Sequence, residues 1–86
     1  MSENVTFVAR TDEVLIRLNQ HHAYKSLTGH LLVRKLNKAT NTFETIIDRQ
    51  TLGGGREEFK AQCSKYGINE YVEHDPYEGE IYRTIR

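Results

Sequence analysis

The chain has 86 residues, a length that suits one domain over residues 1–86 and not two. Leu, Ile, Val and Phe account for 21 of these residues, above the fraction of ~20% below which chains tend to stay disordered. Lys and Arg together number 12, as do Asp and Glu, so the formal net charge is zero and a compact, soluble fold is expected.

Cysteine usage and hydropathy favour a cytoplasmic protein. Cys63 is the only cysteine, which excludes an internal disulfide framework and a thiolate metal cluster. The amino-terminal residues lack the pattern of a secretory signal, and no apolar run approaches the ~20 residues that span a bilayer. We therefore expect no membrane partner.

The first third of the chain combines one clear strand with one ambiguous stretch. Residues 5–10 alternate apolar and polar side chains, which predicts a strand. Residues 14–27 fit two structures, because Leu15 and Leu18 share a helical face while the same stretch also alternates as a strand does. The helix is favoured, since Thr11 precedes the stretch as a candidate N-cap.

The middle of the chain predicts a β-hairpin. Residues 31–36 and 43–48 are short apolar-rich runs, and the polar connector 37–42 between them has the length of a hairpin loop. The three glycines at 53–55 then end the strand pattern and are expected to form a flexible turn.

Residues 56–66 carry the best helix signal of the chain. Phe59, Cys63 and Tyr66 recur at helical spacing and form one apolar stripe. Gly67 is placed for the left-handed residue that commonly ends a helix. This segment is predicted to pack its stripe against a sheet.

Two short strands, at residues 71–74 and 81–85, end the chain and flank a turn at 75–79. The element order is then β-α-β-β-α-β-β, which predicts an α+β fold: a small antiparallel sheet with two helices on one face, in the ferredoxin-like arrangement. If residues 14–27 form a strand, the alternative is a β-rich sheet with one helix.

Acidic and basic side chains are concentrated in different segments. Residues 69–80 contain five acidic side chains and no Lys or Arg, interspersed with tyrosines that add contact area at low entropic cost. We expect a small, non-enzymatic inhibitor, adaptor or regulator whose acidic terminal hairpin contacts a protein partner. The candidate partner-binding residues are Tyr71, Glu73, Asp75, Tyr77, Glu78 and Glu80.

Residues 10–38 carry six basic side chains against two acidic ones, which supports a second hypothesis. Clustered Lys and Arg bind phosphate backbones, so the alternative function is an RNA or single-stranded DNA binding module. Its candidate residues are Arg17, Lys25, Arg34, Lys35 and Lys38. The opposite charge of the two segments is also compatible with a homodimer.

Catalytic and metal-binding patterns are weak. Glu73, His74 and Asp75 are neighbours, but successive side chains of a strand point to opposite faces and cannot easily converge on a metal ion. Cys63 lies on the apolar stripe and is expected in the core. No catalytic residue, metal site or cofactor is therefore predicted, and an enzyme is not expected.

Overall fold

The computed structural model describes residues 3–85, which form a mostly-β fold: one six-stranded antiparallel sheet and a single helix. In chain order the elements are β1 (Glu3–Arg10), β2 (Val14–Ala23), β3 (Ser26–Asn37), β4 (Thr42–Thr51), α1 (Arg56–Lys65), β5 (Glu70–Asp75) and β6 (Gly79–Thr84).

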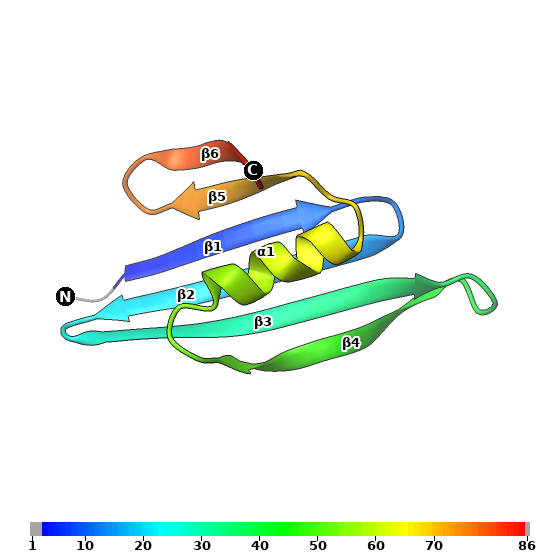
Figure 1. The fold of residues 1–86 in the computed structure, drawn as a ribbon, viewed down its shortest axis with the longest axis horizontal. Coiled ribbons are helices and arrows are strands. Elements are labelled where there is room, and N and C mark those ends of the chain that lie inside the picture. The colour runs from blue at the N-terminus through cyan, green and yellow to red at the C-terminus, as the bar shows by residue number, and fades with distance from the viewer. Residues whose placement is uncertain (1–2, 86) are drawn as a thin grey trace.

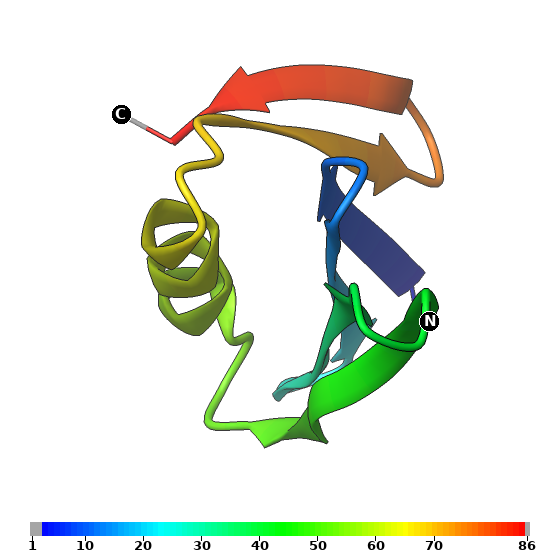
Figure 2. The same cartoon turned by 90° about the vertical axis from the view of Figure 1, so that its right-hand side faces the viewer.

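The strand order in the sheet is β4-β3-β2-β1-β5-β6, with each neighbouring pair antiparallel (Figure 1). The first four strands follow one another as a meander. Helix α1 then crosses back over the sheet, and the chain adds β5 and β6 on the far side of β1. The sheet curves around α1, so the helix lies against its inner face (Figure 2). α1 is neither long nor apolar enough to cross a membrane.

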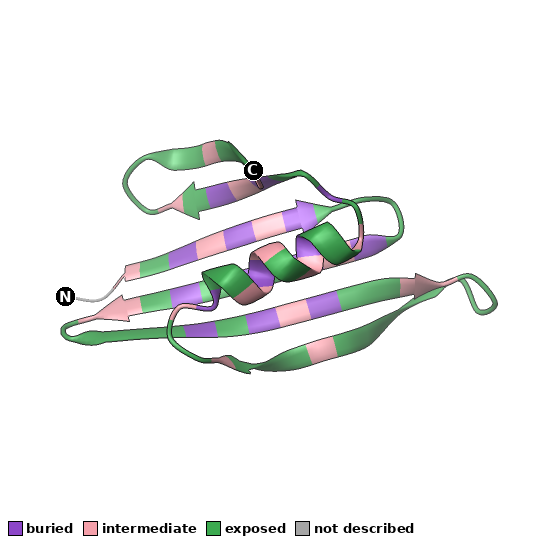
Figure 3. Ribbon diagram, in the orientation of Figure 1, coloured by how far each residue is buried: buried purple, intermediate pink, exposed green. Residues whose placement is uncertain are grey.

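The core lies between α1 and the inner face. Buried side chains alternate with exposed or half-buried ones along β1, β2 and β3, as Figure 3 shows. Phe7 of β1, Phe59 of α1 and Tyr71 of β5 form an aromatic cluster with ring centroids 5.2–5.9 Å apart. This cluster joins the helix to β1, in the four-stranded meander, and to β5, in the terminal hairpin.

The predicted ferredoxin-like fold with two helices is wrong, because residues 14–23 form strand β2. The alternation of Val14, Ile16 and Leu18 places all three in the core, with Ile16 and Leu18 between partners on β1 and β3 and Val14 paired with β3. Thr11, expected to cap a helix, instead accepts hydrogen bonds at Oγ1 from the N–H groups of Glu13 and Val14 in the β1–β2 turn. Pairing on both sides thus outweighs a local helix signal. The one-helix alternative has the observed arrangement.

The other predicted elements are confirmed with shifted ends. β3 and β4 form the expected hairpin, although both strands are longer than predicted. Helix α1 ends as expected: Gly67 has a φ of 71°, and the N–H of Ile68 donates to the carbonyl of Cys63 over 2.8 Å. The terminal strands are confirmed as β5 and β6.

The opposite side of the sheet, here called the outer face, is covered by no other element of residues 3–85 (Figure 2). Strand register gives the side chains that share this face, because paired residues of neighbouring strands point to the same side. Its central members are Thr6, Val8 and Arg10 of β1, Leu15, Arg17 and Asn19 of β2, and His30, Leu32 and Arg34 of β3.

Candidate functional site

The terminal hairpin, β5 and β6 with their turn, is the edge of the sheet beside β1. β5 is paired with β1 through Thr6–His74, Phe7–Glu73 and Val8–Val72, whereas β6 pairs with β5 alone among the strands of residues 3–85. One side of β6 is therefore a free strand edge, which can pair with another chain.

Half of the predicted partner-binding set is held within the fold. The side chains of Tyr71 and Glu73 point to the inner face and are buried, Tyr71 in the aromatic cluster. Asp75 shapes the turn, because its Oδ1 accepts hydrogen bonds from the N–H groups of Tyr77 (2.8 Å) and Glu78 (3.0 Å). These two bonds stabilise the carboxylate and lower the pKa of Asp75. Tyr71 and Glu73 therefore anchor the hairpin to the core, and Asp75 stabilises its turn.

Glu73 joins the hairpin to the helix. Its Oε1 accepts a hydrogen bond from Nε of Arg83 on β6 over 2.8 Å and lies 3.7 Å from a guanidinium nitrogen of Arg56, the first residue of α1. The Glu73 side chain is 9% exposed, while both arginines are about half exposed. The buried carboxylate is thus satisfied by two cations that water still reaches.

We expect Glu73→Ala to lower the free energy of unfolding by about 1–2 kcal/mol. A hydrogen bond to a charged group contributes about 1.5–3 kcal/mol, and the exposure of Arg83 and Arg56 reduces that value. Glu73→Gln should cost less, because its amide oxygen still accepts from Arg83. Urea denaturation of both variants measures the change in stability, and the exposed Glu80→Ala is the control. Equal stability of all three variants would show that the contacts of Glu73 with Arg83 and Arg56 contribute nothing.

The other half of the predicted set is exposed. Tyr77 in the turn is 72% exposed, and Glu78 and Glu80 have no ion pair within residues 3–85. The negative charge of Glu3 beside the Tyr77 phenol raises the pKa of Tyr77 and keeps the phenol protonated. These groups form an accessible acidic and aromatic surface at the hairpin tip.

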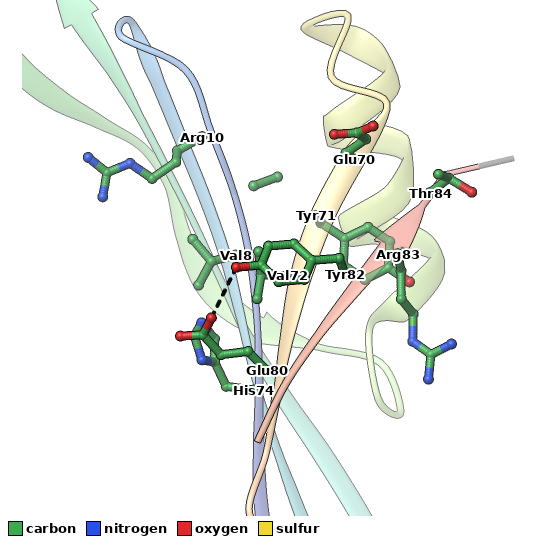
Figure 4. A pocket seen from close by; sticks show the side chains of 11 residues that line it. Val8, Arg10, Glu70, Tyr71, Val72, His74, Glu80, Tyr82, Arg83 and Thr84 are labelled. Carbon is green, nitrogen blue, oxygen red and sulfur yellow. Dashed lines mark hydrogen bonds between the residues drawn. The ribbon is translucent and has the colours of Figure 1, made fainter. Parts of the chain in front are cut away.

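Tyr82 is a further exposed aromatic side chain of the hairpin, beside Glu80 on β6, and is not among the predicted residues. It is 76% exposed, and its hydroxyl donates to Oε2 of Glu80 over 3.2 Å (Figure 4). Its side chain lies toward Val8 and Val72 on the outer face. Alternation along β6, with Arg83 pointing inward to Glu73, is the sequence signal that places Tyr82 outward.

A hollow of about 490 Å³ lies beside Tyr82 where β1, β5 and β6 meet. Figure 4 shows the side chains that line it, with Arg10 and Glu70 at one end and His74 and Glu80 at the other. The hollow connects the acidic hairpin with the outer face of the sheet.

The predicted nucleic-acid set is dispersed over four parts of the molecule. Arg17 and Arg34 lie on the outer face. Lys35 points to the inner side, near the ring of Tyr66. Lys25 occupies the β2–β3 turn, and Lys38 pairs with Glu13 over 2.9 Å near the β3–β4 turn. The structure therefore does not bring the five residues together.

The residues considered for catalysis or metal binding are also separated. His74 points to the outer face and Glu73 to the inner face, as their pairing with Thr6 and Phe7 requires. Over residues 3–85 no group of three His, Cys, Asp or Glu side chains is placed to hold a metal ion. Cys63 is buried, and desolvation raises the pKa of its thiol to about 11, which keeps it protonated at neutral pH.

The exposed groups of the terminal hairpin and the arginines of the outer face are the two surfaces from which a function can be argued. Comparisons of this chain with protein-family models, curated protein sequences and solved structures find no match.

Proposed function

We propose that this chain is a small binding protein that acts as an inhibitor, adaptor or regulator through protein contacts of its terminal hairpin. The observation that carries the proposal is the set of exposed side chains on the terminal hairpin, Tyr77, Glu78, Glu80 and Tyr82: two largely exposed tyrosines and two carboxylates that make no ion pair within residues 3–85. Tyr71, Glu73 and Asp75 hold the hairpin in shape.

The chemistry of this surface suits a partner with a basic docking patch. Tyrosine rings supply rigid contact area with a hydrogen-bonding tip, and such residues are enriched in protein interfaces. The carboxylates of Glu78 and Glu80 favour a positively charged partner and speed its association. Over residues 79–83 the outer edge of β6 is paired with no further strand of residues 3–85, and an extended segment of the partner can add there as a further strand.

In this proposal the protein acts by binding and not by catalysis. The protonated, buried thiol of Cys63 and the separation of His74 from the inner carboxylates support that view. The proposal also places the protein in the cytoplasm, supported by a cysteine that is free and unpaired.

Capture from a cell lysate on immobilised protein, after nuclease treatment, tests the hairpin. We expect the wild-type chain to retain a defined protein and the double variant Glu78→Lys/Glu80→Lys to lose it, because both reversals oppose a basic partner. The matched control is Asp12→Lys/Glu44→Lys, which changes the charge equally at exposed positions outside the hairpin.

Retention by the control and loss by the hairpin variant would support the proposal. If the hairpin variant retains the same protein at the wild-type level, this surface is not the binding site. Tyr77→Ala and Tyr82→Ala then separate the aromatic from the ionic contribution, since each residue is exposed and its removal leaves the core unchanged.

A further inference from the structure

Three arginines gather on the outer face although they are scattered in the sequence. Leu15 of β2 is paired with Arg10 of β1 on one side and with Arg34 of β3 on the other. Arg17 follows on the same face of β2, two residues beyond Leu15, between Val8 and Leu32. With strands about 4.8 Å apart and about 3.4 Å of rise per residue, the backbone positions of the three lie within about 10 Å of one another.

These arginines differ from the other arginines of residues 3–85, each of which has an ion-pair partner. Arg10, Arg17 and Arg34 are exposed and make no ion pair or side-chain hydrogen bond with any residue from 3 to 85. By contrast, Arg49 pairs with Glu58, and Lys38 pairs with Glu13. The outer face therefore presents three free guanidinium groups, each with a planar fork that matches a phosphate.

An aromatic ring adjoins two of these arginines. Arg10 and Arg34 line a second hollow, of about 210 Å³, together with Leu15 and Phe43 of β4. Phe43 is 44% exposed, so part of its ring is open to solvent beside the two cations. Cationic side chains that follow a backbone, combined with an aromatic ring on which a base can stack, are the elements of single-strand binding.

We propose that the arginine face, formed by Arg10, Arg17 and Arg34 with Leu15 and Phe43, binds single-stranded nucleic acid. The guanidinium groups contact successive phosphates, and Phe43 stacks with a base. This inference does not depend on the function proposed for the hairpin, since the two surfaces use different residues and carry opposite charge.

The shape of the sheet favours a flexible strand over a folded protein at this place. The outer face lies on the outside of the curve around α1, so it is convex (Figure 2). A rigid partner meets such a surface over a limited area, and stable protein interfaces need about 800 Å² on each side. A single strand can bend with the surface and keep its phosphates near the arginines.

The acidic hairpin limits the path of that strand. Glu70 lines the same end of the hollow beside β5 as Arg10, and Glu80 lies at the other end (Figure 4). Phosphates are repelled there, so the strand is expected to run over β1, β2 and β3 toward Phe43 on β4. Asp48, the acidic side chain of β4 on the outer face, contacts His30 and not the arginines.

Fluorescence anisotropy of a labelled oligothymidylate of about 12 nucleotides tests the arginine face directly. Each phosphate contact on a single strand contributes about −0.7 to the slope of log affinity against log salt, so three contacts predict a slope near −2. Affinity should then fall about sixteenfold between about 50 and 200 mM salt. We expect Arg10→Gln/Arg17→Gln/Arg34→Gln to weaken binding at least about tenfold and to remove most of this slope.

The matched control is Lys25→Gln/Lys35→Gln/Lys38→Gln, which removes the same charge from the same part of the chain but away from the arginine face. It should keep the slope near −2 and lose less than about threefold in affinity. Phe43→Leu, which keeps an apolar side chain, should weaken binding about fivefold or more through lost stacking.

Four results would overturn the proposal: no binding at about 50 mM salt, an unchanged slope in the arginine variant, tighter binding of a duplex than of the single strand, or equal competition by polyglutamate. The last would indicate an acidic protein as the occupant of this face. Urea denaturation of each variant checks the fold, which exposed Arg→Gln changes should leave intact.

Discussion

Phe59→Ala is expected to destabilise the protein by about 3–5 kcal/mol, a large part of the 5–15 kcal/mol that holds a typical domain folded. Phe59 is fully buried and contacts the rings of Phe7 and Tyr71, with centroids 5.9 and 5.2 Å away. Through these two ring contacts Phe59 joins α1 to both the first strand and the terminal hairpin. Its removal leaves a cavity at the junction of all three elements. Urea denaturation followed by circular dichroism measures the loss.

Two further variants make this prediction decisive. Tyr82→Ala removes an aromatic ring of similar size from the surface and should change stability by less than about 0.5 kcal/mol. Phe59→Leu keeps most of the apolar volume and should cost about 1–1.5 kcal/mol, so it gives a measurable transition even if the alanine variant does not fold. Similar losses for Phe59→Ala and Tyr82→Ala would contradict the packing described for the core.

Loss of Phe59 should also weaken the proposed hairpin site. Tyr71 is buried in the hairpin and contacts the ring of Phe59, while Tyr77 and Tyr82 of the same hairpin are exposed. A binding defect in a Phe59 variant therefore reports on the support of the site and not on contact with a partner.

The sequence predicts those elements that carry their own signal. Helix α1 combines an apolar stripe with Gly67 at its end, and both features act within a few residues of one another. The β3–β4 hairpin is equally local. Strand β2 is different, because its residues gain their pairing from β1 on one side and from β3 on the other. The prediction that Thr11 caps a helix uses only neighbouring residues and ignores these pairing strands. It therefore predicts a helix where the structure has strand β2.

The candidate sites depend on which face each side chain occupies, and that too is decided by pairing. Tyr71 and Glu73 are two residues apart on β5, so both side chains point to the inner face and are buried. They therefore contribute to the core and not to an exposed binding surface. A buried carboxylate needs a partner, and Glu73 has one in Arg83. The β5–β6 register places Arg83 beside Glu73, and this pairing cannot be read from either segment alone.

The same reason explains the dispersal of the basic set. Arg34 and Lys35 are neighbours in the sequence and lie on opposite faces of the sheet. Arg10, which was not among the predicted nucleic-acid residues, joins Arg17 and Arg34 because β1 and β3 flank β2. Sequence clustering thus indicated positive charge in this part of the chain but not the arginine face itself.

The glycine run before α1, predicted to be a flexible turn, forms a turn in which Gly53 is exposed while Gly54 and Gly55 lie against the sheet. Gly55 is buried, and its carbonyl accepts the hydrogen bond from the N–H of Phe59. The carbonyl of Gly54 accepts a hydrogen bond from the buried side chain of Gln20 over 3.0 Å. These contacts fix the start of the helix relative to β2.

Gly55→Ala is therefore expected to cost about 3–4 kcal/mol, and Gly53→Ala only about 1–2 kcal/mol. Both glycines have positive φ, 75° and 59°, so a side chain at either position is strained to a similar extent. A Cβ on Gly53 meets open space, whereas one on Gly55 would lie 2.7 Å from Cβ and Cγ2 of Thr51. The difference between the two variants in urea denaturation isolates this contact, because their backbone strain largely cancels. Equal losses would mean that Thr51 moves aside and that the run is as adaptable as its composition suggests.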